Sequence, residues 1–395
     1  MWSLRPVVRA LAYRVTLRVG AALLQAVALV LLARDLGVTK FGEFVLGVTV
    51  GSVLSGVTGL GIPTRALRLH REPDPATYAQ LMVNYSAVAS VINGAMVLLI
   101  LKIVGVPAGL ALASAAVVVA DQFCGAAQAV LAGSQNYRGS ANIILLQRLV
   151  PIVGVGLALV ANWAVLPGYA LAAVGFAIGV GLWKVRRRRG GDVRVLLSGA
   201  WGFVLASTTG LMANLDVSVV RLSAGIQAAG LYGAASRLVS PLSIAVSTLL
   251  SVVVPHGAAM ENRRERARLF QRALRAVAIV SVMMMAAAPI IGSAVVWALG
   301  DEYRRSFGTV VAVVIGVGLS AISQVLQAEL LTEGRAATAG ALIGCGALLG
   351  LAVLAVAGAT IGLSALWIGP IAMQAAILGL LWWARWRLAT RTGNR

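Results

Sequence analysis

The chain has 395 residues, of which 59% are hydrophobic and 12% are charged, and its mean hydropathy is +0.90. Soluble domains carry about 25% charged residues, so this composition excludes an ordinary soluble globular protein and indicates many membrane spans. In a soluble chain the net charge of +20 would favour nucleic acid as a partner. In a membrane protein it indicates cationic loops against lipid headgroups, so we expect anionic membrane lipids, and no nucleic acid, as partners.

Apolar runs long enough to cross a bilayer follow one another along the whole chain. A spanning helix needs about 20 apolar residues, because each adds about 1.5 Å towards crossing about 30 Å of hydrocarbon. In the first half the runs are 15–34, 43–64, 79–101, 107–131, 142–161 and 164–183. In the second half they are 196–220, 229–254, 273–299, 308–329, 337–359 and 363–384. We therefore predict an all-α polytopic integral membrane protein with about twelve transmembrane helices.

Basic residues gather on alternate connections between these runs. Arginines precede the first run, KVRRRRGGDVR follows the sixth, and ENRRERARLFQRALR follows the eighth. The positive-inside rule places these segments and both termini in the cytoplasm. The basic N-terminal segment leads into an apolar run without a small-residue cleavage site. We interpret it as the start of the first span and not as a removed signal peptide.

A short stretch near the start of the chain recurs in its second half. LLARDLGVTKFGEF at 31–44 resembles VVRLSAGIQAAGLY at 219–232. Three pairs of residues share the offset of 188: Gly37 and Gly225, Gly42 and Gly230, Phe44 and Tyr232. The repeat predicts two parallel six-helix lobes, 1–185 and 196–395, joined by a basic cytoplasmic linker at 186–195.

Each copy of the repeated stretch joins the first two spans of its lobe. We predict a tight external hairpin in which Gly37 or Gly42, or their counterparts, supply a turn with positive φ. The aromatic residue that ends each copy is expected at the level of the lipid headgroups.

Arginines inside predicted spans are candidates for binding a substrate. Arg148 lies early in the fifth span and Arg237 in the eighth. A guanidinium matches phosphate oxygens, so a cationic cavity that holds an anionic headgroup is one interpretation; snorkelling or a structural ion pair is the other. Arg18 and Arg65 lie nearer the cytoplasmic ends, where they line an inward entrance or simply follow the positive-inside rule.

Two carboxylates also lie within predicted spans. Asp121 is in the middle of the fourth span and Asp216 is late in the seventh. Each is a candidate site for coupling to H⁺ or Na⁺, because carboxylates in membranes often carry coupling ions. The alternative is a carboxylate paired with an arginine, and Asp216 with Arg237 is such a pair.

The sequence carries no pattern for a metal, a cofactor or a catalytic group. Cys124 and Cys345 have no metal-ligand spacing and are expected to be small core residues. GVGLAL and GCGALLG lie in apolar runs and indicate close helix packing rather than a phosphate cradle. With neither a nucleophile–base pair nor a P-loop, we expect no enzyme and no ATP-driven pump.

Three stretches resemble a known family of membrane transporters. LARDLGVTKFGEF, LDVSVVRLSAGIQAAGLYGAASRL and AVLAGSQNYRGSANIILLQRLV are similar to segments of the polysaccharide-unit flippases, a branch of the MOP superfamily. The resemblance implies two MATE-like six-helix lobes around a cavity that opens alternately to each membrane face. It also implies a bacterial plasma membrane, a polyprenyl-pyrophosphate-linked oligosaccharide as cargo, and polysaccharide polymerase or glycosyltransferase partners.

Other functions remain open at this point. Cation-coupled efflux of small molecules has the same fold, but it favours acidic, aromatic-lined pockets over arginines. A membrane-embedded glycosyltransferase or ligase needs acidic groups in a sizeable external loop, and the external connections here are about ten residues or fewer by the span count. A scaffold without transport is the least favoured, because charges within membranes usually serve a function.

Overall fold

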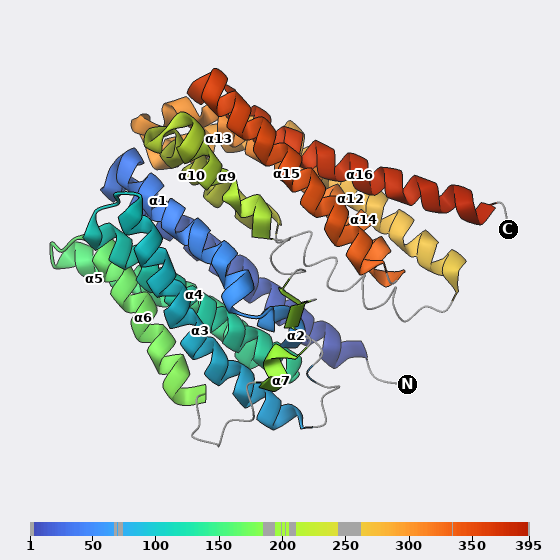
Figure 1. Ribbon diagram of the computed structural model, residues 1–395, viewed down its shortest axis with the longest axis horizontal. Coiled ribbons are helices and arrows are strands. Elements are labelled where there is room, and N and C mark those ends of the chain that lie inside the picture. The colour runs from blue at the N-terminus through green and yellow to red at the C-terminus, as the bar shows by residue number, and fades with distance from the viewer. Residues whose placement is uncertain are drawn as a thin grey trace. The chain divides into compact units, whose positions relative to one another are not determined.

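The computed structural model is helical throughout the residues it describes, which are 4–66, 69, 74–184, 194–198, 200–201, 203–204, 211–243, 262–333 and 335–393. The chain divides into two compact units, Met1–Asn214 and Leu215–Arg395 (Figure 1). Among the described residues, nine helices are long and apolar enough to span a membrane. These features confirm the predicted all-α, polytopic membrane fold. The predicted linker 186–195 lies mostly outside the described residues, and the lobe limits 1–185 and 196–395 stay predictions.

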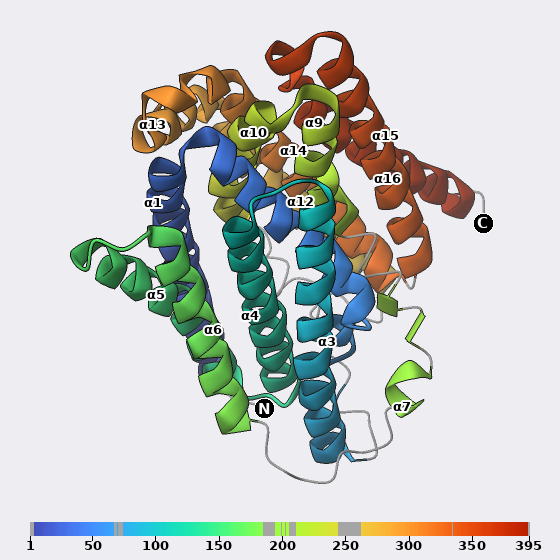
Figure 2. The same ribbon diagram turned by 60° about the vertical axis from the view of Figure 1, so that its left-hand side comes forward.

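The first unit consists of a bundle of long helices and two short ones (Figures 1 and 2). In chain order its helices are α1 (Leu4–Thr58), α2 (Ile62–Ala66), α3 (Pro75–Ile103), α4 (Ala108–Gly133), α5 (Tyr137–Val160), α6 (Val165–Lys184) and α7 (Arg194–Leu197). The first two predicted spans form the continuous α1, with a break in helical geometry at Gly37. Polar side chains fix helix starts: Asp74 accepts a hydrogen bond from the Thr77 amide at 3.1 Å, and Asn136 accepts one from the Gly139 amide at 2.9 Å.

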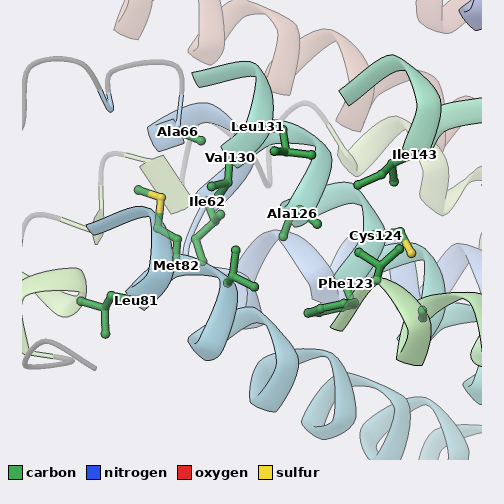
Figure 3. Close-up of a cluster of buried hydrophobic side chains, with 14 of the residues drawn as sticks. Ile62, Ala66, Leu81, Met82, Phe123, Cys124, Ala126, Val130, Leu131 and Ile143 are labelled. Carbon is green, nitrogen blue, oxygen red and sulfur yellow. The ribbon is translucent and has the colours of Figure 1, made fainter. Parts of the chain in front are cut away.

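The core of the first unit lies between α2, α3, α4 and α6 (Figure 3). Met82 and Cys124 are completely buried in this cluster. Cys124 is therefore the core residue that was predicted, whereas Cys345 is exposed on the surface of the second unit and that prediction was wrong. Between α5 and α6, a Cβ atom added at Gly154 would lie 2.6 Å from the Gly168 carbonyl oxygen, which confirms close helix packing by the GVGLAL segment.

The second unit is also a helical bundle. The short η2 (Met212–Leu215) crosses the limit between the two units in the sequence. The elements of the second unit are α9 (Asp216–Ala224), α10 (Ile226–Val239), η3 (Ser240–Ser243), α12 (Arg263–Ala286), α13 (Ala288–Leu299), η4 (Asp301–Ser306), α14 (Phe307–Thr332), α15 (Ala336–Thr360), η5 (Gly362–Ala365) and α16 (Ile368–Gly393). The predicted span 273–299 is divided at Ala287 into α12 and α13, because Pro289 cannot continue the hydrogen-bond ladder of α12. The predicted spans 196–220 and 229–254 lie partly outside the described residues.

Small residues let α15 and α16 approach closely. A Cβ atom at Gly350 would lie 2.3 Å from the Met373 Cβ, and one at Gly346 would lie 2.6 Å from the Ile377 Cγ1. These contacts confirm that GCGALLG is a helix-packing segment.

The repeated stretch adopts the same backbone conformation in both units. Gly37 has φ 69° and ψ 171°, and Gly225 has φ 89° and ψ 176°. This region is essentially restricted to glycine, so the predicted positive φ is confirmed at these two positions. Gly42 instead continues the helix. Phe44 and Tyr232 are each 2% exposed, so their rings pack inside the protein, and the predicted position at the headgroup level stays a prediction.

Candidate functional site

The first unit holds a partly buried ion pair between α4 and α5. Arg148 Nη1 donates to Asp121 Oδ1 at 3.0 Å and to Asp121 Oδ2 at 3.3 Å. The arginine side chain is 20% exposed and the aspartate side chain 33%. Partial exposure allows the pair to meet a ligand, while the shared hydrogen bonds offset part of the cost of removing two charges from water.

Further polar side chains extend this pair into a cluster across three helices. Gln147 Nε2 donates to Asp121 Oδ1 at 2.7 Å, and Gln128 Nε2 donates to Gln147 Oε1. Tyr169 from α6 lies within interaction range of the Arg148 guanidinium. We name Asp121, Gln128, Gln147, Arg148 and Tyr169 the first-unit polar cluster. Its members bond to one another at partly buried positions, as polar groups within a membrane require.

The ion pair lies halfway along its two helices. Asp121 is twelve residues before the end of α4 (121 to 133), and Arg148 is eleven residues after the start of α5 (137 to 148). Because α5 begins five residues before the predicted start at 142, Arg148 is near the middle of its helix and not early in it. A short turn joins the two helices, so residues at equal distances from the turn meet across the hairpin. That symmetry was the sequence signal for the pair, and the sequence reasoning missed it.

A second polar network joins α1, α3 and α4, and sequence reasoning did not assemble it. Asn93 is completely buried, and its Nδ2 donates to Gly51 O at 2.9 Å and to Gln122 Oε1 at 2.5 Å. Gln122 Nε2 donates in turn to Thr58 Oγ1 at 3.2 Å. Buried amides that bond across helices stabilise helix packing in membranes, and this is the role the contacts support.

The second unit holds a different group of polar side chains, around the hairpin at Gly225. Asp216 is the first residue of α9, and its carboxylate accepts a hydrogen bond from the Val217 amide at 2.7 Å. Tyr232 and Arg237, both on α10, lie within interaction range of that carboxylate. We name Asp216, Tyr232 and Arg237 the second-unit polar cluster. The proximity of Asp216 and Arg237 agrees with the pairing that the sequence left open.

Arg65 has structural contacts within the first unit. It follows the second predicted span and donates to three carbonyl oxygens at the end of α7: Leu196 O at 2.5 Å, Val195 O at 3.0 Å and Ser198 O at 3.5 Å. Its guanidinium also lies 5.3 Å from the ring centroid of Tyr78. Arg65 thus caps a helix C-terminus. Arg18 is half-buried on α1, and neither arginine belongs to the first-unit polar cluster.

Comparison with solved structures identifies the architecture. An outward-facing multidrug resistance MATE family transporter of the MOP superfamily matches with a TM-score of 0.63 and 14% identity, covering 96% of this chain and 96% of its own. An inward-facing structure of such a transporter matches with a TM-score of 0.61 and 14% identity, covering 95% and 94%. A eukaryotic MATE transporter matches with a TM-score of 0.59 and 14% identity, again covering 95% and 94%. The chain has the MATE fold.

Neither a protein-family model nor a curated protein sequence matches the chain. At this level of identity the structural matches show the MATE fold and do not show which substrate the chain handles. Among the described residues, no three His, Cys, Asp or Glu side chains gather as metal ligands would. The chemistry available in the two polar clusters is therefore hydrogen bonding and ion pairing by arginine, carboxylate, amide and phenol groups.

Proposed function

We propose that this protein is a flippase that moves polyprenyl-pyrophosphate-linked oligosaccharide units from the cytoplasmic to the outer leaflet of a bacterial plasma membrane. The proposal combines the MATE fold with the resemblance of three sequence stretches to the polysaccharide-unit flippases. The oligosaccharide would then feed a cell-surface polysaccharide made with polymerase or glycosyltransferase partners.

One observation carries the choice of an anionic cargo: Arg148 in the middle of α5. Both of its hydrogen bonds to Asp121 start from Nη1. A guanidinium has five N–H donors in a planar fork, so donors remain for phosphate oxygens once Asp121 is bound. Since the side chain is 20% exposed, an approaching pyrophosphate can reach those donors.

The second-unit polar cluster contains a further candidate for contact with an anionic cargo. Its Arg237 is also held near a carboxylate, Asp216. Solved MATE structures include outward-facing and inward-facing conformations. In our proposal this protein alternates between two such conformations. During the change, the phosphate groups of the cargo displace the carboxylates from the arginines. Release of Asp121 or Asp216 from its arginine would then let that carboxylate take up H⁺ or Na⁺.

A reconstitution experiment tests the flippase directly. The full chain is placed in liposomes with a polyprenyl-pyrophosphate oligosaccharide, and a membrane-impermeant glycosidase reports how much cargo becomes accessible over time. We expect faster exposure with the wild-type protein than with empty liposomes, and loss of that gain in Arg148→Ala and Arg237→Ala. Undiminished flipping in both variants would contradict the proposed role of the arginines in binding the cargo. If the wild-type protein did not flip this lipid, the proposed cargo would be contradicted.

Cation-coupled efflux of small molecules is the second candidate, and the MATE names of the solved matches favour it. Cells that lack the protein distinguish the two functions. A flippase predicts accumulation of lipid-linked oligosaccharide on the cytoplasmic leaflet with unchanged drug sensitivity. Efflux predicts increased sensitivity to cationic compounds and normal levels of the lipid-linked intermediate.

A further inference from the structure

An apolar groove flanked by tryptophans and arginines lies on the second unit. It has a volume of about 510 Å³ and lies between α14 and α16. The residues that line it are Leu319, Ala375, Leu378, Gly379, Trp382, Trp383 and Trp386. Its volume falls in the range of roughly 300–1,000 Å³ that is typical of ligand sites.

The tryptophans of this groove are exposed on the C-terminal half of α16. Trp382, Trp383 and Trp386 are 51%, 45% and 60% exposed. Trp382 follows the start of α16 at Ile368 by fourteen residues (368 to 382), which is about 21 Å along a helix. The predicted span 363–384 ends among these tryptophans, so we expect them near the membrane surface, where indole rings are favoured.

Two guanidinium groups lie on the tryptophan faces at the polar end of the groove. Arg387 is 4.0 Å from the ring centroid of Trp383, and Arg385 is 5.9 Å from that of Trp382. Arg385 also forms an ion pair with Glu329 of α14, with 3.1 Å between Nε and Oε2. The ring contact orients Arg387 beside the mouth of the groove without neutralising its charge.

We propose that this groove binds one anionic phospholipid of the surrounding bilayer. An acyl chain would fill the apolar part along Leu319 and Leu378, and the phosphate would lie against Arg387. Charge complementarity selects this occupant, because the groove is apolar along its length and cationic at the end where a lipid carries its phosphate.

Brominated lipids test the proposal through tryptophan fluorescence of the full-length protein in nanodiscs. One series carries phosphatidylglycerol with bromines on its acyl chains, and the other carries phosphatidylcholine brominated in the same way, at equal mole fractions. We expect stronger quenching by brominated phosphatidylglycerol, and no such preference in the triple variant Trp382→Phe, Trp383→Phe, Trp386→Phe. Removing the exposed Trp163 of the first unit is the matched control and should leave the preference unchanged.

Arg387→Gln keeps all three tryptophans and tests the phosphate contact by itself. One basic residue near a membrane surface is worth about 1 kcal/mol, so we expect the preference for phosphatidylglycerol to fall about fivefold. Arg335→Gln, at an exposed position before α15, is the matched control and should change nothing. Equal quenching by the two lipids in the wild-type protein would overturn the proposal.

Two further outcomes would also overturn it. If unlabelled polyprenyl phosphate displaces brominated phosphatidylglycerol, the groove belongs to the cargo and not to a resident lipid. If quenching is absent and the protein is a dimer that the tryptophan variant breaks, the groove is covered by a second copy. Lipid binding is measured here without flipping, so the result is independent of the proposed transport function.

Discussion

Both units hold charged side chains inside an apolar helical bundle, but the elements that position these charges differ. In the first unit Arg148 and Asp121 come from adjacent long helices and share two hydrogen bonds at mid-helix. In the second unit Asp216 and Arg237 flank the hairpin at Gly225, on two short consecutive helices. The first-unit cluster is thus fixed by the packing of long helices, whereas the second depends on the geometry of one turn.

The repeat shows that these clusters are not copies of each other. At the offset of 188, Asp216 corresponds to Ala28 (216 to 28) and Arg237 corresponds to Thr49 (237 to 49). The glycine conformation is shared by both copies, but the charges are not. The two units therefore share the backbone turn but not the charges around it.

The largest expected effect comes from breaking the first-unit ion pair. Arg148→Ala leaves Asp121 without its main cationic partner, at a cost of about 3 kcal/mol or less because the pair is partly exposed. Flipping should be abolished and the melting temperature lowered, measured by the glycosidase assay and by thermal unfolding in detergent. Arg138→Ala, at an exposed position near the start of the same helix, is the control and should change neither.

The double variant Arg148→Met, Asp121→Leu separates stability from function. Replacing both charges by apolar groups removes the unpaired charge, so the melting temperature should recover towards the wild-type value. Flipping should stay abolished if Arg148 contacts the cargo. If both the melting temperature and flipping recovered, the ion pair would have only a structural role.

A smaller and more specific effect is expected at Asp216. If this carboxylate couples transport to an ion, Asp216→Asn should remove the dependence of flipping on a pH or sodium gradient. Downhill exchange without a gradient should persist, because Asn keeps the size of the side chain and can still accept a hydrogen bond. Asp121→Asn should instead lower stability through the loss of its charge-assisted bonds to Arg148. If flipping by the wild-type protein and by Asp216→Asn depended equally on the gradient, another residue would have to carry the coupling ion.

Apolar run length, the alternation of basic connections and the repeated glycines were enough to predict an all-α polytopic membrane fold with two lobes. Long apolar runs identify spanning helices because the bilayer fixes the length each must have. Gly37 and Gly225 could be predicted as turn residues because few other residues tolerate their φ and ψ. The division of the span 273–299 was missed because its apolar composition is continuous, and only Pro289 signals the break.

The polar clusters were harder to predict, because they depend on which helices are neighbours. The sequence identified Asp121 and Arg148 as unusual charges, but their pairing became visible only once α4 and α5 formed a hairpin. Tyr169 joins from a third helix, and its hydroxyl cannot be told from a packing residue by composition. For Arg65 the sequence left open an inward entrance and the positive-inside rule, and no local pattern indicated its hydrogen bonds to the carbonyl groups at the end of α7.

The glycine turns offer a direct test of the shared backbone. Gly37→Ala and Gly225→Ala should each cost about 1–3 kcal/mol of stability, because both require φ and ψ that alanine rarely adopts. At Gly225 an added Cβ has no atom within 4 Å, so backbone strain would be the cause there and not a clash. Gly156→Ala is the control, since it also meets nothing within 4 Å but lies in α5. If either substitution left the stability unchanged, the two turns would not be equivalent.

The smallest expected effect is local and concerns Arg65. Its hydrogen bonds to the carbonyls of residues 195, 196 and 198 attach the end of α7 to the first unit, each worth about 1 kcal/mol net or less at a partly exposed site. Arg65→Ala should therefore raise amide hydrogen exchange around 194–198 severalfold and leave global unfolding nearly unchanged. Arg65→Lys retains the charge but lacks the planar fork, so it should resemble the alanine variant more than the wild type. If lysine restored full protection, charge near the helix end would account for the attachment and the directed hydrogen bonds would not.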